Sequence, residues 1–212
     1  MIAMPDSAAK PKPRDAERSR RLLLDAAEAL FAEQGYAGTS IQAIADRAGL
    51  TKGTPLYFFG SKDNLYKAVL DRLFAEAGAT MGAVGAQLSA GSVEDLVDAA
   101  VDAYIDFLAA RPNFVRLMAR EAIDGGLHVH QTAGNAAALA AGFGMLGPDA
   151  RAAFRDPRIE QVMLSVMAMC VFPFMQADNL VKALKREAYA PAFIAERKAH
   201  VKQLLRHGLY RS

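Results

Sequence analysis

The stretch GLTKGTPLYFFGSK, residues 49–62, combines residue types that ordinary helices and surface loops keep apart. A lysine, two threonines and a glycine stand directly before a run of large apolar and aromatic residues, and the stretch closes on Ser61 and Lys62. A short helix that packs with one face and contacts another molecule with the other requires this mixture. The flanking sequence indicates what kind of molecule that is.

Residues 39–59 predict two helices joined by a tight turn. Thr39 and Gln42 have the spacing of a capping box, in which two side chains satisfy backbone N–H groups at a helix start. Gly49 is expected to end this first helix, and Thr51 to cap the second. The result is a helix-turn-helix layout, the arrangement in which a second helix enters a DNA groove.

Longer helices flank this pair. An amphipathic helix is predicted over Asp15–Gln34 and ends at Gly35, and another runs over residues 62–82. Leu56 and Phe59 are expected to anchor the short second helix on the apolar residues of its neighbours.

The polar residues of the stretch suit a nucleic acid. Lys52 and Lys62 fall in the first turns of predicted helices, where the helix dipole disfavours a cation unless an anion such as phosphate binds there too. Thr51 and Thr54 offer hydroxyl and methyl groups to base edges, and Gly53 lets the backbone approach closely. An ordinary helical hairpin with solvated lysines remains the alternative at this point.

The wider order of residues is more specific. It runs LLLDAAEALFAEQGYAGTSIQAIADRAGLTKGTPLYFFGSKDNLYKAVLDRLF, from Leu22 to Phe74. This order resembles the DNA-binding domain of the TetR family of transcriptional regulators. The resemblance implies an all-α protein with an N-terminal three-helix DNA-binding domain and a C-terminal helical domain that binds a ligand and forms a dimer.

The resemblance and the helix positions together assign the candidate DNA-contact residues. These are Thr39, Ser40, Thr51, Lys52, Gly53, Thr54, Pro55, Tyr57, Phe58 and Lys62. Thr39 and Tyr57 are expected at phosphates. Leu56 departs from the family pattern, since it stands where a tyrosine that touches phosphate is usual, and Phe58 stands where histidine is common.

The predicted domain organisation follows. Residues 1–14 form a basic tail without regular structure, residues 15–62 the helix-turn-helix domain, and residues 63–212 the ligand-binding and dimerisation domain, with residues 62–82 as the connecting helix. Further helices are expected over residues 92–110, 112–123, 133–145, 156–177 and 191–207.

Two sets of residues in the second domain are candidates for binding. Large apolar side chains are expected to line a ligand cavity: Phe74, Met81, Tyr104, Phe107, Phe114, Met118, Phe143 and Met145. Val162–Met175 is apolar nearly all round, so it must be covered on both sides, and Val166, Met169 and Leu204 are expected at an interface with a second copy.

Composition and charge exclude several classes. A single cysteine, Cys170, fits a reducing cytoplasm and is expected to be a buried apolar residue. The longest apolar run is too short to span a bilayer, and no signal peptide is evident. The net charge is +2, but residues 93–124 are acidic and residues 182–211 basic, and the basic run is interpreted as solvated charge.

No catalytic, metal or cofactor pattern emerges. His128 and His130 lack a convincing third ligand and are interpreted as ordinary loop residues, and Arg120 with Glu121 as a structural ion pair. The leading hypothesis is a cytoplasmic homodimeric regulator, usually a repressor, that binds an inverted-repeat operator in double-stranded DNA and responds to a small apolar or amphipathic effector. The alternative is an all-α ligand-binding or enzyme domain without DNA binding.

Overall fold

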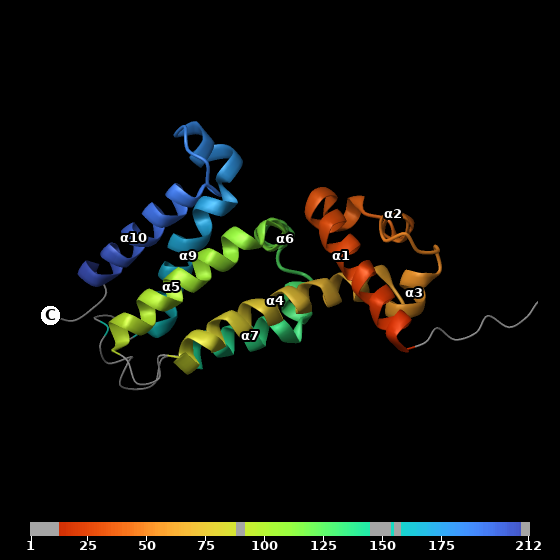
Figure 1. Cartoon of the computed structure of the whole chain (residues 1–212), viewed down its shortest axis with the longest axis horizontal. Helices are drawn as coiled ribbons and strands as arrows, with labels where there is room; N and C mark the ends of the chain where they lie inside the picture. The colour runs from red at the N-terminus through yellow and green to blue at the C-terminus, as the bar shows by residue number, and fades with distance from the viewer. Residues whose placement is uncertain (1–12, 88–91, 145–153, 155–157, 209–212) are drawn as a thin grey trace, which may run out of the picture. The chain divides into compact units, whose positions relative to one another are not determined.

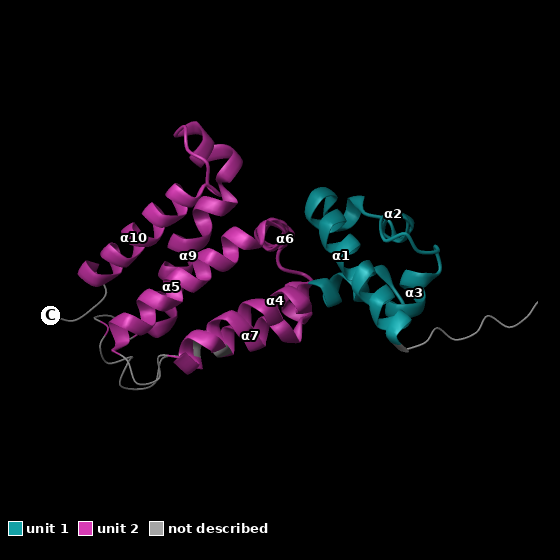
Figure 2. Cartoon of the chain, viewed as in Figure 1, with its two compact units in different colours: residues 1–69 teal, residues 70–212 magenta. Residues whose placement is uncertain are grey.

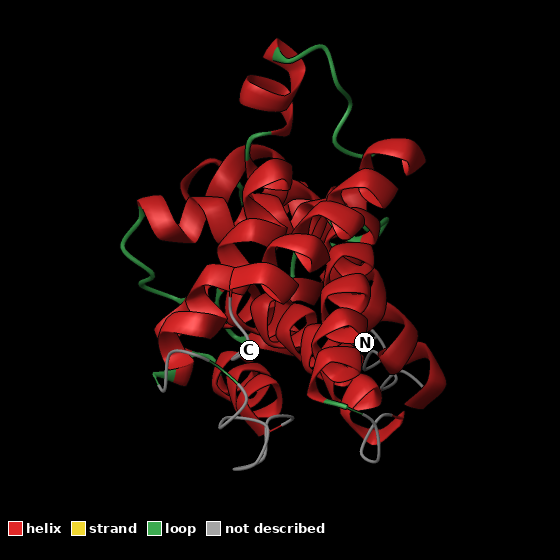
Figure 3. Ribbon diagram, turned by 90° about the vertical axis from the view of Figure 1, so that its left-hand side faces the viewer, coloured by secondary structure: helices red, strands yellow, loops and turns green. Residues whose placement is uncertain are grey.

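The computed structural model describes residues 13–87, 92–144, 154 and 158–208, and every regular element in those ranges is a helix (Figure 3). This confirms the all-α prediction. The chain divides into two compact units, Met1–Val69 and Leu70–Ser212 (Figure 2). The division falls within a long helix, at Val69 rather than at the predicted position 62. Among the described helices, none combines the length and the apolar character needed to cross a membrane.

The first unit consists of α1 (Pro13–Gly38), α2 (Ile41–Arg47), α3 (Thr54–Phe59) and the start of α4 (Lys62–Gln87) (Figure 1). Aromatic rings pack at its centre. The rings of Phe31 and Tyr66 meet edge to face with their centroids 4.7 Å apart, and the centroids of the Tyr36 and Tyr66 rings are 5.2 Å apart. On the outside, the Arg47 guanidinium makes paired hydrogen bonds of 2.8 and 3.0 Å to the Glu33 carboxylate, which join α2 to α1.

The helix starts differ from the prediction at residues 39 and 40. Gly35 has a φ of 77° and interrupts α1 where the sequence placed its end. The Thr39 side chain is buried, and its hydroxyl donates to the carbonyl oxygens of Leu30 and Gly35 at 3.2 and 2.8 Å. Ser40 caps α2 instead, because its Oγ accepts from the Ala43 N–H at 3.0 Å. The predicted capping box at Thr39 is therefore wrong.

The anchor of α3 also differs. The helix begins at Thr54 with Gly53 as its N-cap, not Thr51. Pro55 and Phe59 are buried one turn apart on the same face, whereas Leu56 is 47% exposed. Phe59 was correctly expected to anchor α3. The expectation that Leu56 anchors it too was wrong, because Pro55 and Phe59, four residues apart, form the buried face and Leu56 is exposed beside it.

The second unit contains the rest of α4 and the helices that follow it. These are α5 (Val93–Ala110), α6 (Pro112–Ile123), η1 (Val129–Gln131), α7 (Ala133–Gly144), α9 (Ile159–Met175), η2 (Ala177–Val181) and α10 (Pro191–Gly208). Starts marked by a cap or a proline were predicted well, and the Ser92 Oγ accepts from the Asp95 N–H at 3.1 Å. The predicted start of α9 at Asp156 and Pro157 lies outside the described residues.

Charged residues join α5 to α10, which lie side by side (Figure 1). The ammonium groups of Lys198 and Lys202 lie 2.6 and 2.8 Å from the carboxylates of Asp106 and Asp102. One turn further along, Arg206 pairs with Asp98. The acidic and basic runs therefore neutralise each other in part across this helix pair, and the interpretation of the C-terminal run as merely solvated charge was incomplete.

Close backbone contact joins α7 to α4. The Gly134 N–H donates to the Asp71 carboxylate at 2.9 Å, so a side chain of α4 satisfies a backbone group in the first turn of α7. A Cβ atom at position 134 would lie 2.9 Å from the Asp71 carbonyl oxygen and 3.0 Å from the Phe74 Cβ. Only glycine allows this approach.

Replacement of Gly134 by alanine is therefore expected to destabilise the protein. The added methyl group meets backbone, which cannot move aside cheaply, and we expect Gly134→Ala to lower the free energy of unfolding by about 1–3 kcal/mol. Gly82→Ala is the matched control, because Gly82 is an α4 glycine with nothing within 4 Å of an added Cβ. That variant is expected to gain up to about 1 kcal/mol from helix propensity. Thermal unfolding compares the two, and equal melting temperatures would contradict the contact described.

Candidate nucleic-acid interface and apolar cavity

The outward face of the first unit carries most of the predicted DNA-contact residues. Thr51, Lys52 and Gly53 are exposed in the turn before α3, and Thr54 is half-buried at its start. The hydroxyl groups of Thr51 and Thr54 share a hydrogen bond of 2.8 Å, which stiffens the turn. The sequence thus brings small polar groups together at the N-terminal end of α3.

Two large side chains point away from the unit on α3. Tyr57 is 70% exposed, with its ring edge to face against Phe58 at 5.2 Å, and Leu56 is 47% exposed. Phe58 is half-buried. Because Pro55 and Phe59 already hold the helix, these residues are not needed for its packing. They form an amphipathic surface that suits the sugar, phosphate and methyl groups of a DNA groove.

Lys62 is held in place by an aromatic ring. Its Nζ lies 4.4 Å from the centroid of the Tyr36 ring, and partial burial lowers the pKa of the ammonium. Ser61 accepts from the Asn64 N–H at 3.0 Å and so caps α4 at the same place. The charge is thereby fixed at a helix start rather than left on a freely moving chain.

Thr39 and Pro55 require correction as contact candidates. Both side chains are buried, and the Thr39 hydroxyl is already bonded to two carbonyl groups of α1. Thr39 therefore stabilises the turn into α2, and Pro55 anchors α3. Ser40 is exposed and uses its lone pair to cap α2, so its own proton remains available for a phosphate.

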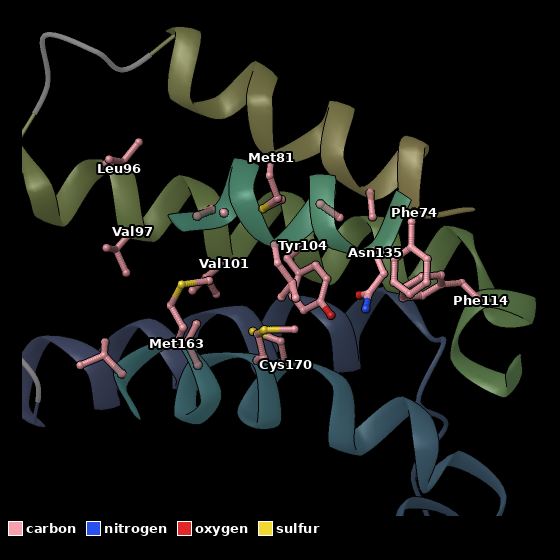
Figure 4. Close-up of a pocket in the computed structure, with 18 of the residues that line it drawn as sticks. Phe74, Met81, Leu96, Val97, Val101, Tyr104, Phe114, Asn135, Met163 and Cys170 are labelled. Carbon is pink, nitrogen blue, oxygen red and sulfur yellow. The ribbon is translucent and has the colours of Figure 1, made fainter. Parts of the chain in front are cut away.

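The second unit encloses an apolar cavity of about 170 Å³ (Figure 4). Five helices and Phe154 form its wall. The lining residues are Phe74, Ala77 and Met81 of α4, Leu96, Val97, Ala100, Val101 and Tyr104 of α5, Phe114 of α6, Asn135, Ala138, Leu139 and Gly142 of α7, and Val162, Met163, Val166, Met167 and Cys170 of α9.

The predicted cavity residues divide into two groups. Phe74, Met81, Tyr104 and Phe114 line the cavity, as the sequence predicted. Phe107 does not, since it is buried behind the wall with its ring 5.1 Å from that of Phe114.

The other three candidates do not add to the described wall. Met118 is half-buried outside the lining. The Phe143 side chain and Met145 lie outside the described residues.

Sequence reasoning missed the contribution of α9 and, in α7, that of Asn135, Ala138, Leu139 and Gly142. Val166, predicted at an interface, lines the cavity instead, because it lies one turn from the buried Val162 and Cys170 on the inward face of α9. In a helix that is apolar on all sides, the spacing of the apolar residues does not indicate which face points to the interior. Asn135 was missed because α7 is nearly all alanine and glycine.

The cavity contains few polar groups. Burial raises the pKa of Tyr104 well above its usual value and that of the Cys170 thiol to about 12. Both groups therefore stay protonated at neutral pH. The expectation that Cys170 is a buried apolar residue agrees with this environment.

Glu121 and His128 form a buried pair outside the cavity lining. Glu121 accepts from the backbone N–H groups of His128 and Val129 at 3.1 and 3.0 Å, and its other oxygen lies 3.1 Å from the His128 Nδ1. His128 is therefore not an ordinary exposed loop residue, and it is the partner that Glu121 holds. The described residues contain no group of three or more potential metal ligands.

Two sequence profiles match the chain in the regions just described. "Bacterial regulatory proteins, tetR family" covers residues 23–69, and "Tetracyclin repressor-like, C-terminal domain" covers residues 94–205. The chain belongs to the TetR family. Residues 23–69 include α2, the turn and α3, which carry most of the predicted DNA-contact residues.

Individual relatives agree with this assignment. The HTH-type transcriptional repressor NicS of Pseudomonas putida is 28% identical over 163 residues, which are 74% of this chain and 76% of NicS. The HTH-type transcriptional activator FasR of Mycolicibacterium smegmatis is 38% identical over 96 residues, 45% of this chain and 42% of FasR. The structure of the ketosteroid transcriptional regulator KstR2 of Mycobacterium tuberculosis shares the fold, with a TM-score of 0.65 and 16% identity over 97% of this chain and 99% of KstR2.

The TetR-family chain is thus a DNA-binding transcriptional regulator. Its relatives are regulators rather than enzymes. The alternative of an all-α domain without DNA binding loses its support, because the matched N-terminal region is the DNA-binding domain of the family.

Gly53 offers a clean test of the DNA-facing turn. Its φ and ψ are −77° and −18°, which any residue adopts, and nothing lies within 4 Å of an added Cβ. Gly53→Ala is therefore expected to leave the melting temperature nearly unchanged. If DNA approaches the backbone here, the methyl group is expected to weaken DNA binding about tenfold or more. Calorimetry and fluorescence anisotropy measure the two quantities, and unchanged affinity would remove Gly53 from the interface.

Proposed function

We propose that this TetR-family regulator is a homodimeric repressor that binds an inverted-repeat operator and leaves it when a small molecule occupies the cavity. The observation that carries the proposal is the outward face of α3, whose large side chains are exposed while Pro55 and Phe59 hold the helix from behind. Such a regulator acts in the cytoplasm, where the DNA is.

The surface residues divide by chemistry. Thr51, Lys52, Gly53 and Thr54 are assigned to base edges, because they surround the start of the helix that enters the groove. The exposed Leu56 and half-buried Phe58 are apolar and suit thymine methyl groups.

Phosphate contacts are assigned to groups at the margins of this surface. Tyr57 carries a phenol on an exposed ring, Lys62 a positioned ammonium, and Ser40 a hydroxyl with a free proton. Contacts of this kind orient the domain on DNA without reading sequence.

The dimer is assigned to α9 and α10. Leu164 and Phe172 of α9 are 61% and 50% exposed, and Leu204 of α10 is 46% exposed. These are large apolar side chains on a helix pair whose inner sides already cover the cavity and α5. A second copy that buries them would also place two DNA-binding units on one duplex, and a two-fold dimer reads an inverted repeat.

Repression rather than activation is supported by NicS, which matches 74% of the chain and is named a repressor. A cavity in one unit and a DNA-contact surface in the other give an effector a site of its own. Occupation of the cavity is the event that we assign to operator release.

DNA affinity is expected to fall steeply as salt rises, because phosphate binding releases counterions. Lys62→Ala is expected to weaken binding and to reduce the salt slope by about one for each subunit, because its ammonium is assigned to phosphate. Lys182→Ala, at an exposed lysine of the second unit, is the control and is expected to behave as the wild type. Duplexes selected from random DNA, titrated by fluorescence anisotropy at several salt concentrations, provide the measurement. Affinity that does not respond to salt would overturn the DNA-binding assignment.

Dimerisation is expected to depend on the exposed face of α9. Phe172→Arg places a charge in the proposed interface, so we expect a monomer in sedimentation at micromolar concentration. DNA affinity is expected to fall by tenfold or more, since linked half-sites bind together. Ile123→Arg is the control, because Ile123 of α6 is 84% exposed and lies outside α9 and α10. A dimeric Phe172→Arg variant would place the interface elsewhere.

A further inference from the structure

We propose that the molecule which fills the cavity is uncharged and compact, with one or two rings and a hydroxyl or carbonyl group that binds Tyr104 and Asn135. The inference rests on the proposed function only in taking the cavity as the effector site. It concerns the chemistry of the ligand and is tested by ligand binding without DNA.

The wall carries no charge that could meet an ionic ligand. Aspartate, glutamate, lysine and arginine are all absent from the lining residues that the structure describes. An ionised carboxylate, phosphate or ammonium group would therefore move out of water into a site that holds no partner of opposite charge. That transfer is unfavourable enough to exclude it, or to force the group into its neutral form.

One cation among the described residues acts on the wall from outside, and it is already engaged in hydrogen bonds. Arg197 of α10 influences the Cys170 thiol electrostatically, but its Nε and Nη2 atoms donate to the Met169 carbonyl oxygen at 3.1 and 2.6 Å. Burial lowers the pKa of this guanidinium. An anionic ligand would have to break the main-chain contact and pass the wall of α9.

Two polar groups of the wall are available instead. Within the described residues, neither the Tyr104 hydroxyl nor the Asn135 amide makes a hydrogen bond to another group. Figure 4 shows the two side chains beside each other, with Asn135 next to Phe74 and Phe114 and Tyr104 nearer the middle of the cavity. Because burial keeps the Tyr104 phenol protonated, it can donate, and the amide can both donate and accept. A ligand hydroxyl complements the pair, and a carbonyl complements its donors.

The remaining surface suits rings. The Phe74 and Phe114 rings meet edge to face at 5.6 Å, and Met81, Met163 and Met167 add polarisable side chains to the wall. The volume of about 170 Å³ is slightly above that of an apolar cavity of about 150 Å³ known to hold benzene. One ring or two fused rings therefore fit, and long acyl chains do not fit without rearrangement.

Capture by a covalent bond is not expected. The thiolate is the reactive form of cysteine, and a pKa of about 12 keeps Cys170 as the thiol. The ligand therefore binds reversibly, and removal of the free ligand restores the empty cavity.

Three probes of nearly equal shape test the proposal: 2-naphthol, naphthalene and 2-naphthoate. Isothermal titration of the full-length protein is expected to show 2-naphthol binding roughly tenfold more tightly than naphthalene, and 2-naphthoate binding at least about a hundredfold more weakly than 2-naphthol. Preferred binding of 2-naphthoate would overturn the uncharged class. Failure of all three to bind at millimolar concentration would overturn the ligand class as a whole.

Variants separate the hydrogen bond from the shape of the cavity. Tyr104→Phe and Asn135→Leu are each expected to weaken 2-naphthol about 3- to 10-fold and to leave naphthalene affinity unchanged, which also shows that the cavity is folded. Tyr189→Phe is the control, because Tyr189 packs on Phe174 outside the lining. Unchanged 2-naphthol affinity in both cavity variants would overturn the assignment of this subsite.

The DNA complex is titrated separately with the same probes. If 2-naphthol binds as expected but selected DNA stays bound, the ligand class stands and the proposed release is wrong. If DNA is released by 2-naphthoate and the free protein prefers this anion, release stands and the ligand class is wrong. The two failures are therefore distinct.

Discussion

The surface that reads DNA depends on how a six-residue helix is held. A helix as short as α3 does not persist alone, because too few backbone hydrogen bonds compensate for its ordering. Pro55 restricts the backbone at the helix start, and Phe59 is buried, with the guanidinium of the exposed Arg20 lying 5.2 Å from the centroid of its ring. These two residues occupy one face, so Leu56 and Tyr57 are left exposed without loss of packing.

The sequence predicted the fold well because most helix starts carry their own mark, such as Ser92 or Pro112. It failed where neighbours compete for one role. Thr39 and Ser40 can both cap α2, and only burial of Thr39 between backbone carbonyls decides between them. The exposed residues around Gly53 follow from a motif, so their positions were foreseen, while their contacts with DNA remain predictions.

The cavity was only half foreseen, and the reason is physical. Aromatic residues and methionines in the sequence indicate the wall of a cavity. Such a wall also needs small residues that let helices approach each other, as Gly134 lets α7 approach α4. Alanine and glycine carry no pattern that identifies an inward face. Nor does a uniformly apolar helix such as α9, and for this reason Val166 was placed on the wrong side.

The ion pairs between α5 and α10 have a consequence for alignment. The acidic residues recur every four positions, as do their basic partners: Asp98, Asp102 and Asp106 face Arg206, Lys202 and Lys198. If α10 slid by four residues, about 6 Å, two of the three pairs would re-form with new partners. Charge alone therefore tolerates more than one alignment, and the fully buried Val201 and nearly fully buried Leu205 select the observed one. The spacing of the charged residues thus permits a small set of alignments of α5 and α10, and apolar packing determines which of them the protein adopts.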